Sequence, residues 1–437
     1  MPESKSRIID CSTVKPDTFT VPNVTVQELR NVIPPHCFRS STTKSFFYVL
    51  RNVFAIAAIY TVTLLVDVCI DPSFISLPHP LAYSVSRFWV WAVYGFWTSV
   101  FAGALWIIAH DCAHQAFSES KLVCDITGLI IHTALGVPHF AWRISHAQHH
   151  RFTGHMGKDN FHVPATRSSL GLPPADSSED DLLGSKVPND AKTIIWEALG
   201  ESPIATTYRC IVYAILGWPL YLCMNFLGPA NYPKGTNHFN PNAIIFTPQQ
   251  YWQVVWSNLA MVFWAAGLSI WASKRGIWEV LTVYGVPYLW LNHLIAITTL
   301  LQHTDPRLPR FRDPGFTFVR GALSTFDRPV LGDWDSCIAR ISTYVTHGIL
   351  ENHVVHHVCS KIPHYHAWAA SAELRKFLHS RGIQSEGAPA SWGEVFRILR
   401  ECRFVEDEGD IVFYKNAHGI AQMRPVWGNG SINSDNA

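Results

Sequence analysis

Four long apolar runs constrain the fold of this chain more than any other feature. They cover residues 53–70, 88–109, 252–271 and 277–301. Each run can cross the roughly 30 Å hydrocarbon core of a bilayer as a helix that rises about 1.5 Å per residue. Charged residues make up only 15% of the chain, against roughly 25% in soluble domains. We therefore expect an all-α polytopic membrane protein with four transmembrane helices.

The segments between the runs set the expected topology. Residues 1–45 have a basic excess, whereas the short loop 71–87 is poor in Lys and Arg. The positive-inside rule then places residues 1–45 in the cytosol. The apolar stretches 122–142 and 210–227 contain proline and polar residues, so we expect interfacial or re-entrant helices there. With residues 273–276 as a tight hairpin, all histidine-rich segments fall on the cytosolic side, in a helical cap.

The chain is expected to have three parts, and its sequence argues against three other features. Residues 1–45 form a cytosolic arm, 46–415 the membrane unit and 416–437 a C-terminal tail, with 164–200 as a polar cytosolic linker. The N-terminus lacks an apolar core, so we expect no cleavable signal peptide. A net charge of +1 gives no reason to expect a nucleic-acid partner. Ten cysteines without a C-x-x-C pair argue against a disulfide framework or a zinc knuckle.

Three histidine sets have spacings that suit one face of a helix. They are H-D-C-A-H at residues 110–114, H-A-Q-H-H at 146–150 and H-V-V-H-H at 353–357. Because positions i, i+3 and i+4 share a helix face, each set can aim its imidazoles at one point. Each lies beside a membrane boundary, where ionisable side chains are costly and usually functional. The histidines predicted to share a metal centre are His110, His114, His146, His149, His150, His353, His356 and His357.

A ninth ligand is expected just past the last apolar run, at His303 in L-Q-H-T-D-P. Imidazole suits zinc, copper, iron and nickel, but one zinc ion takes about four ligands. Nine histidines fit two metal ions better, and we favour two non-haem iron ions with O₂ as co-substrate. We expect no catalytic residue apart from these ligands. Four histidines are expected to orient the ligands through hydrogen bonds: His132, His155, His347 and His366. Four others are expected to be ordinary polar residues: His36, His79, His379 and His418.

The chain resembles the membrane fatty acid desaturases, specifically the oleate Δ12 (ω-6) type of fungi and plants. The resemblance runs from about residues 33–38 to about 405–414, and its most specific pieces are H-D-C-A-H-Q-A-F-S, S-H-A-Q-H-H followed by T-G-H-M and Asp159, L-Q-H-T-D-P, and H-G-I-L-E-N-H-V-V-H-H. It implies that the three boxes and His303 hold two iron ions, with Asp159 among the supporting residues. It also implies a fatty acyl lipid or acyl-CoA substrate and an endoplasmic reticulum membrane, with the active site facing the cytosol. Electrons would come from a cytochrome b5 with its reductase, as a separate protein because the chain has no H-P-G-G haem-binding motif.

Several positions depart from the pattern of oleate desaturases. The first box carries Asp111 and Ala113 where Glu and Gly are usual, and the other departures are His139, Asn258, Arg310 and Pro329. Relatives that form acetylenic or conjugated products often carry Asp in that box. Three hypotheses stay open: a desaturase that converts oleoyl to linoleoyl chains, an acetylenase or hydroxylase with the same centre, and a non-catalytic metal-binding or transport membrane protein.

Overall fold

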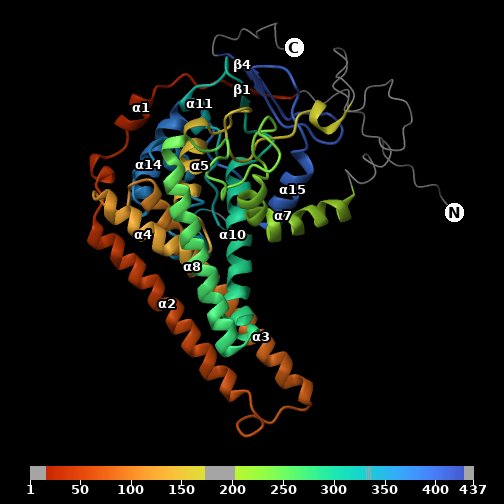
Figure 1. The fold of residues 1–437 in the computed structure, drawn as a ribbon. Coiled ribbons are helices and arrows are strands. Elements are labelled where there is room, and N and C mark those ends of the chain that lie inside the picture. The colour runs from red at the N-terminus through yellow and green to blue at the C-terminus, as the bar shows by residue number, and fades with distance from the viewer. Residues whose placement is uncertain (1–15, 173–201, 331, 333, 335, 428–437) are drawn as a thin grey trace, which may run out of the picture.

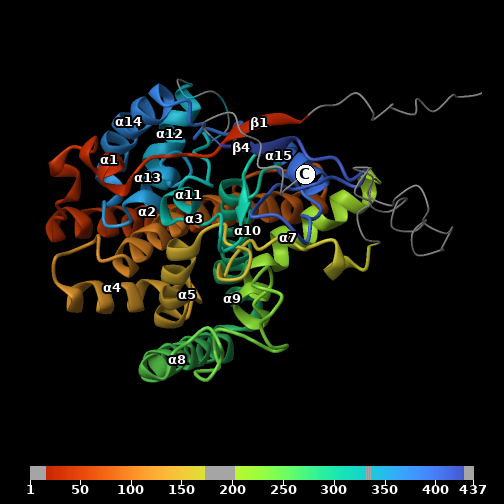
Figure 2. The same cartoon turned by 90° about the horizontal axis from the view of Figure 1, so that it is seen from above.

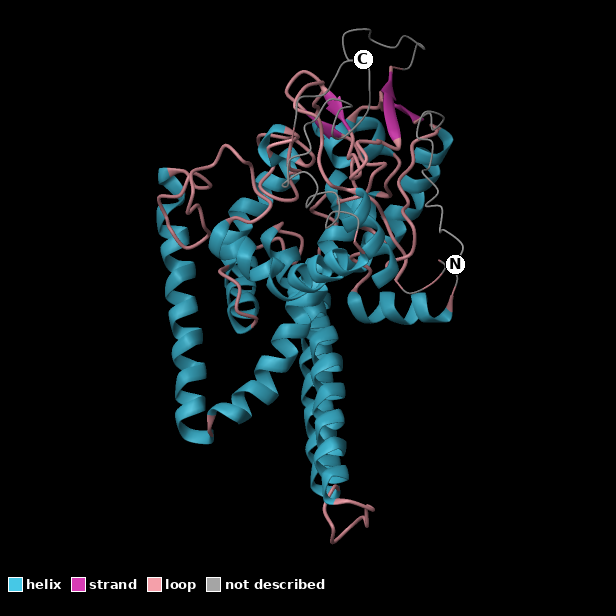
Figure 3. Cartoon of the chain, turned by 90° about the vertical axis from the view of Figure 1, so that its right-hand side faces the viewer, coloured by secondary structure: helices cyan, strands magenta, loops and turns pink. Residues whose placement is uncertain are grey.

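A computed structural model describes residues 16–172, 202–330, 332, 334 and 336–427. Most of the expected linker 164–200 lies outside the described residues. In the described parts the chain is mainly helical. Long helices project from one side of a larger helical cap, and the short strands lie at the opposite end of the molecule (Figures 1 and 3).

The four expected membrane spans are confirmed as four helices that are long and apolar enough to cross a bilayer. They are α2 (Thr42–Cys69), α3 (Pro80–Ala113), α8 (Tyr251–Arg275) and a run from α9 (Ile277–Val280) through a π-helical turn to α10 (Val286–His303). Gly276, at φ 90°, makes the tight hairpin between α8 and α9. Helices α2 and α10 both pack on α3. Because α3 and α10 continue past the spans, they carry their C-terminal histidines into the cap.

Two further apolar segments are helical but take other directions. Helices α4 (Lys121–Ala134) and α5 (His139–Phe152) are bent by 107° at the turn between them, as a broken span or a re-entrant loop would be. Gly136, at φ 70°, and Pro138 account for this break. Helix α7 (Pro203–Met224) lies across the direction of the spans (Figure 1) and is not among the four span candidates, as expected for residues 210–227.

Short helices and two small sheets build the rest of the cap. The sheets pair β1 (Asp17–Thr20) with β4 (Met423–Val426) in parallel, and β2 (Arg310–Phe311) with β3 (Ile411–Val412) antiparallel. The helices are α1 (Val26–Asn31), α11 (Phe318–Ala322), α12 (Cys337–Thr346), α13 (His353–Val358), α14 (His364–Ser380) and α15 (Trp392–Glu401). Short 3₁₀ turns lie at Pro35–Phe38, Ser168–Leu170 and Pro248–Gln250.

The described part of the N-terminal arm packs on the cap, a contact that its basic excess does not predict. Leu29, Ile33 and Cys37 are buried in one apolar cluster with Val354 of α13 and Leu374 of α14. The pairing of β1 with β4 also fixes the arm to the C-terminal tail. A few apolar residues spaced four apart were enough to dock the described part of the arm onto the element that carries the third histidine set.

Candidate metal centre

Four elements from distant parts of the chain bring the predicted ligands together. The C-terminal ends of α3 and α10 enter the cap side by side, and α5 lies between α8 and α13 when the molecule is seen from above (Figure 2). Helix α3 supplies the first histidine set, α5 the second, α13 the third and α10 His303. All of these sets face the same interior volume because each uses one helix face, as the spacing predicts.

Five imidazoles form the first group. One ring nitrogen of each lies within 4.8 Å of one from every other member: His110, His114, His146, His150 and His356. The Nε2 atom of His150 lies 3.1 Å from Nε2 of His146 and 3.0 Å from Nε2 of His356. This group therefore joins the first, second and third sets around one point.

Three further imidazoles form a second group by the same criterion: His149, His303 and His357. The Nε2 atoms of His149 and His303 lie 3.3 Å apart. His353 stands outside this trio, but its Nε2 lies 2.8 Å from Nε2 of His303. The two groups adjoin, since the rings of His150 and His357 stack with centroids 4.1 Å apart. All nine predicted ligands thus fall into two neighbouring clusters.

The donor atoms of these clusters fit metal cations. Burial, followed by the charge of neighbouring imidazoles, lowers the pKa of His356 and His357 well below the usual value, so the rings are neutral. A neutral imidazole has one nitrogen that can only accept. The Nε2 atoms of His114 and His357 are buried without any hydrogen-bond partner. Converging lone pairs of this kind are satisfied by cations, and five nitrogens beside four match two ions with imidazole ligands.

Asp159 supports the second cluster directly. Its carboxylate lies 2.7 Å from Nδ1 of His149 and also accepts hydrogen bonds from the backbone N–H groups of Gly154 and Phe161. Nδ1 of His149 is therefore the protonated nitrogen, which leaves Nε2 free to bind an ion. Thr153 acts similarly on His357, since its hydroxyl lies 3.1 Å from Nδ1 of that ring.

The four other histidines expected to orient ligands make their contacts elsewhere. Nδ1 of His132 lies 2.9 Å from Nδ1 of His139, and His347 lies beside Asn52. His155 reaches the exposed carboxylate of Asp313, and His366 packs edge-on against His36. In the described residues none of the four hydrogen-bonds to a predicted ligand, because their positions lie behind or outside the helix faces that carry the sets.

Two other residues near the centre were not singled out from the sequence. His364 donates to Asp111 through both its backbone N–H (3.0 Å) and Nδ1 (2.8 Å), so the unusual Asp of the first box ties α3 to α14. His162 is buried at φ 54°, with its ring stacked on His303 at 5.6 Å and its Nε2 unpartnered. The unusual Asp111 in the first box could have drawn attention to its partner His364. His162 belongs to no regularly spaced histidine set, so no sequence signal pointed to it.

Arg310, another departure from the family pattern, is also accounted for. Its side chain is buried and donates to the backbone carbonyl of His303. The guanidinium lies over the ring of Tyr414, 5.5 Å from the centroid. Arg310 therefore satisfies a carbonyl at the C-terminal end of α10, beside the second cluster.

An apolar cavity of about 640 Å³ reaches the centre from between α3, α10 and α12. Its inner end is lined by ligands of both clusters together with Trp106, Trp142, Trp218 and Tyr221, which are all buried. Its outer end is lined by Trp97, Ile338, Ile341 and Trp392, which are all exposed. The cavity therefore extends from exposed apolar side chains to the histidines of both clusters.

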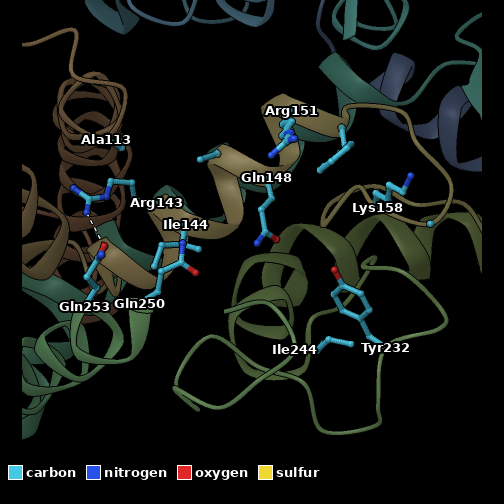
Figure 4. Close-up of a pocket in the computed structure, with 13 residues that line it drawn as sticks. Ala113, Arg143, Ile144, Gln148, Arg151, Lys158, Tyr232, Ile244, Gln250 and Gln253 are labelled. Atoms are coloured by element: carbon cyan, nitrogen blue, oxygen red, sulfur yellow. Dashed lines mark hydrogen bonds between the residues drawn. The ribbon is translucent and has the colours of Figure 1, made fainter. Parts of the chain in front are cut away.

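A second hollow, of about 660 Å³, lies on the opposite face of α5 (Figure 4). Its wall includes Arg143, Gln148 and Arg151 from α5 and Tyr232 from a loop. Arg143 is already paired with Asp125 and Gln253. None of the predicted ligands lines this hollow. Of the two cavities, only the apolar one reaches the histidine clusters.

Comparison with known proteins agrees with this arrangement. The family model described as fatty acid desaturase matches residues 86–179, which contain the first two histidine sets. The chain is 35% identical over 398 residues to the Delta(12) fatty acid desaturase of Mortierella isabellina, which covers 91% of this chain and 92% of that protein. It is 33% identical over 403 residues to the omega-6 fatty acid desaturase, endoplasmic reticulum, of Brassica juncea, covering 91% and 92%. It is 31% identical over 434 residues to an oleate hydroxylase of Claviceps purpurea, covering 94% and 84%. The chain is thus a multi-pass membrane enzyme that belongs to the membrane fatty acid desaturase family.

Proposed function

We propose that the protein is an O₂-dependent acyl desaturase that inserts a double bond into an oleoyl chain, giving a linoleoyl chain. One observation carries the proposal: two adjoining clusters of converging imidazoles line the inner end of an apolar cavity. An acyl chain is the ligand that such a cavity suits, because its walls offer apolar contacts and few polar ones.

The proposed ligands divide between two iron ions. His110, His114, His146, His150 and His356 would hold one ion, and His149, His303, His353 and His357 the other. Iron bound there would supply the oxidising power to remove two hydrogens from neighbouring, unactivated methylenes while O₂ is reduced to water, with two electrons from the substrate and two from a donor.

The protein's own contribution is placement and exclusion of water. Asp159 keeps the proton of His149 on Nδ1, and Thr153 does the same for His357. Buried indoles of Trp106 and Trp142 pack against His110 and His146, so the inner end of the cavity is dry. Correct placement of two adjacent carbons is the main demand of this reaction on the protein.

We infer the same cellular setting that the family resemblance implies. A separate cytochrome b5 with its reductase would deliver electrons at the cytosolic face of the endoplasmic reticulum membrane, and the acyl carrier would be a membrane lipid or CoA. The relative from Brassica juncea, whose name places it in the endoplasmic reticulum, supports this location. We also propose residues 46–415 as the desaturase unit, between the arm and the tail.

A second outcome has its own support. The oleate hydroxylase of Claviceps purpurea matches almost the full chain, and the first histidine set carries Asp111. Hydroxylation, or conversion of a double bond to a triple bond, therefore ranks second. Metal transport has no such support from the relatives compared above, which are desaturases and a hydroxylase.

Expression in yeast without a Δ12 activity, with oleate or linoleate supplied, tests the proposal. Mass spectrometry of cell lipids should show linoleate from oleate, and a His149→Ala variant should form none. A hydroxylated or triple-bonded product with no increase in linoleate would favour the second outcome. Iron-loaded protein that changes no acyl chain would contradict the proposal.

A further inference from the structure

His293 is an ionisable side chain inside a membrane span and on the wall of the apolar cavity. It lies in α10, ten residues before His303 in the chain. A helix rises about 1.5 Å per residue, which puts His293 ~15 Å along the axis from His303. An extended acyl chain covers such a distance between its carboxyl end and its middle.

The imidazole of His293 is held by two tryptophans at the outer end of the cavity. Its ring centroid lies 4.8 Å from that of Trp392 and 5.5 Å from that of Trp290. Trp392 is 51% exposed, whereas the ligand His303 at the other end is 2% exposed. His293 therefore has a fixed position where the cavity meets the apolar surface.

Several hydroxyl and amide side chains on the cavity wall are satisfied by the protein, whereas the indole N–H groups of Trp106 and Trp218 at its inner end have no partner among the described residues. Gln302 donates to the carbonyl of Ile349, and Thr299 to that of Ile295. Within the described part of the chain, His293 makes ring contacts but no hydrogen bond. An unpaired polar group in apolar surroundings costs free energy, and an intramembrane ionisable residue usually has a function. A partner that arrives with the ligand removes this cost.

We propose that His293 determines specificity by hydrogen-bonding to an oxygen atom of the acyl substrate, ~15 Å along the axis of α10 from the predicted ligand His303. The proposal rests on the acyl substrate of the proposed function. It adds one hydrogen-bonding group at the outer end of the apolar cavity. The oxygen has two sources of the same chemistry: the carbonyl at the head of the chain, or a hydroxyl on the chain itself. Trp290 and Trp392 fix the ring, so that only chains in one register place an oxygen within reach.

Binding to the detergent-purified full chain tests this without turnover. His293→Phe keeps a flat ring between the tryptophans but removes both nitrogens, and His293→Gln restores a donor. His379→Phe, at an exposed position on α14, is the matched control. The ligands are octadecene, methyl oleate and a hydroxylated oleate, each measured as a dissociation constant by competition with a labelled fatty acid.

The three ligands distinguish the two possible oxygen sources from each other and from a result that rejects the proposal. Loss of one neutral hydrogen bond should weaken binding roughly 3- to 10-fold. A loss with His293→Phe for methyl oleate but not octadecene assigns the head carbonyl, and a loss confined to the hydroxylated chain assigns the chain hydroxyl. His293→Gln should recover part of either loss, and His379→Phe should change nothing. Equal binding of all three ligands by wild type and His293→Phe would overturn the proposal. Wild type that binds these ligands but never desaturates them would instead overturn the proposed function alone.

Discussion

The Nε2 atoms of His150 and His356 lie 3.0 Å apart, although 206 residues separate them in the chain. One ring comes from the last turn of α5, the second helix of the bent pair, and the other from the short helix α13 of the cap. Helix α5 packs directly on the spans α3 and α8, whereas α13 packs on α14 and α11 of the cap. The membrane helices therefore act as the frame, and the cap closes the ligand set.

Asp159→Asn should weaken iron binding and lower activity by about 10- to 100-fold, the usual effect of losing a carboxylate behind a metal-binding histidine. The buried Asp159 carboxylate fixes the proton on Nδ1 of His149, and an amide does so less well. Chelator competition measures the affinity, and lipid analysis measures the activity.

Asp313→Asn is the matched control for that change. Its carboxylate also contacts a histidine, His155, but is 71% exposed. We expect wild-type iron affinity from this variant. Equal losses in the two variants would show that Asp159 acts by general charge and not by orienting His149.

Asp111→Asn should lower the free energy of unfolding by about 1.5–3 kcal/mol, the range for buried hydrogen bonds to a charged group. The carboxylate accepts both hydrogen bonds from His364 and does not line the cavity. The identity of the lipid product should therefore stay the same. Thermal unfolding in detergent and mass spectrometry check the two parts.

A double-mutant cycle sharpens the test of Asp111. His364→Phe removes the other partner, so the double variant should lose less stability than the sum of the single changes. A change of product with Asp111→Asn, at unchanged stability, would instead show that this residue selects the reaction outcome.

Arg328→Met should destabilise the cap by about 3 kcal/mol, because it removes the fully buried cation that Asp305 and Glu394 share. These carboxylates would keep only the partly exposed Arg307 and Arg397. Arg328 is fully buried and pairs with Asp305 at 2.8 Å and Glu394 at 2.7 Å. Arg307→Met removes a more exposed partner of Asp305, for which we expect a loss of about 1 kcal/mol or less. Thermal inactivation compares them, and similar losses would contradict the role of Arg328 as the central cation.

The sequence was sufficient to predict the four spans and the convergence of the nine histidines. Length and apolar content identify helices in a membrane because unsatisfied backbone groups are not tolerated there. Spacing placed each set on one helix face. Neither argument could divide the histidines into a group of five and a group of three with His353 beside it. The division separates His149 from its sequence neighbour His150 and depends on how α5 and α13 face each other.

Contacts between distant residues could not be predicted in the same way. His155 and His347 are histidines of the kind that can orient metal ligands, but they contact Asp313 and Asn52 respectively. The arm looked polar, yet Leu29 and Ile33 dock it on the cap. In each case the outcome depends on which surface lies opposite in the folded chain, and local sequence does not contain that information.

Iron content of the purified chain tests the central claim most directly. Wild type should hold two iron ions per chain. His356→Ala, in the group of five imidazoles, and His357→Ala, in the group of three, should each reduce the iron content. Mössbauer spectra should show a different remaining iron site in each variant. A wild-type chain with a single tightly bound ion, or the same remaining site in both variants, would contradict the assignment of two neighbouring metal sites.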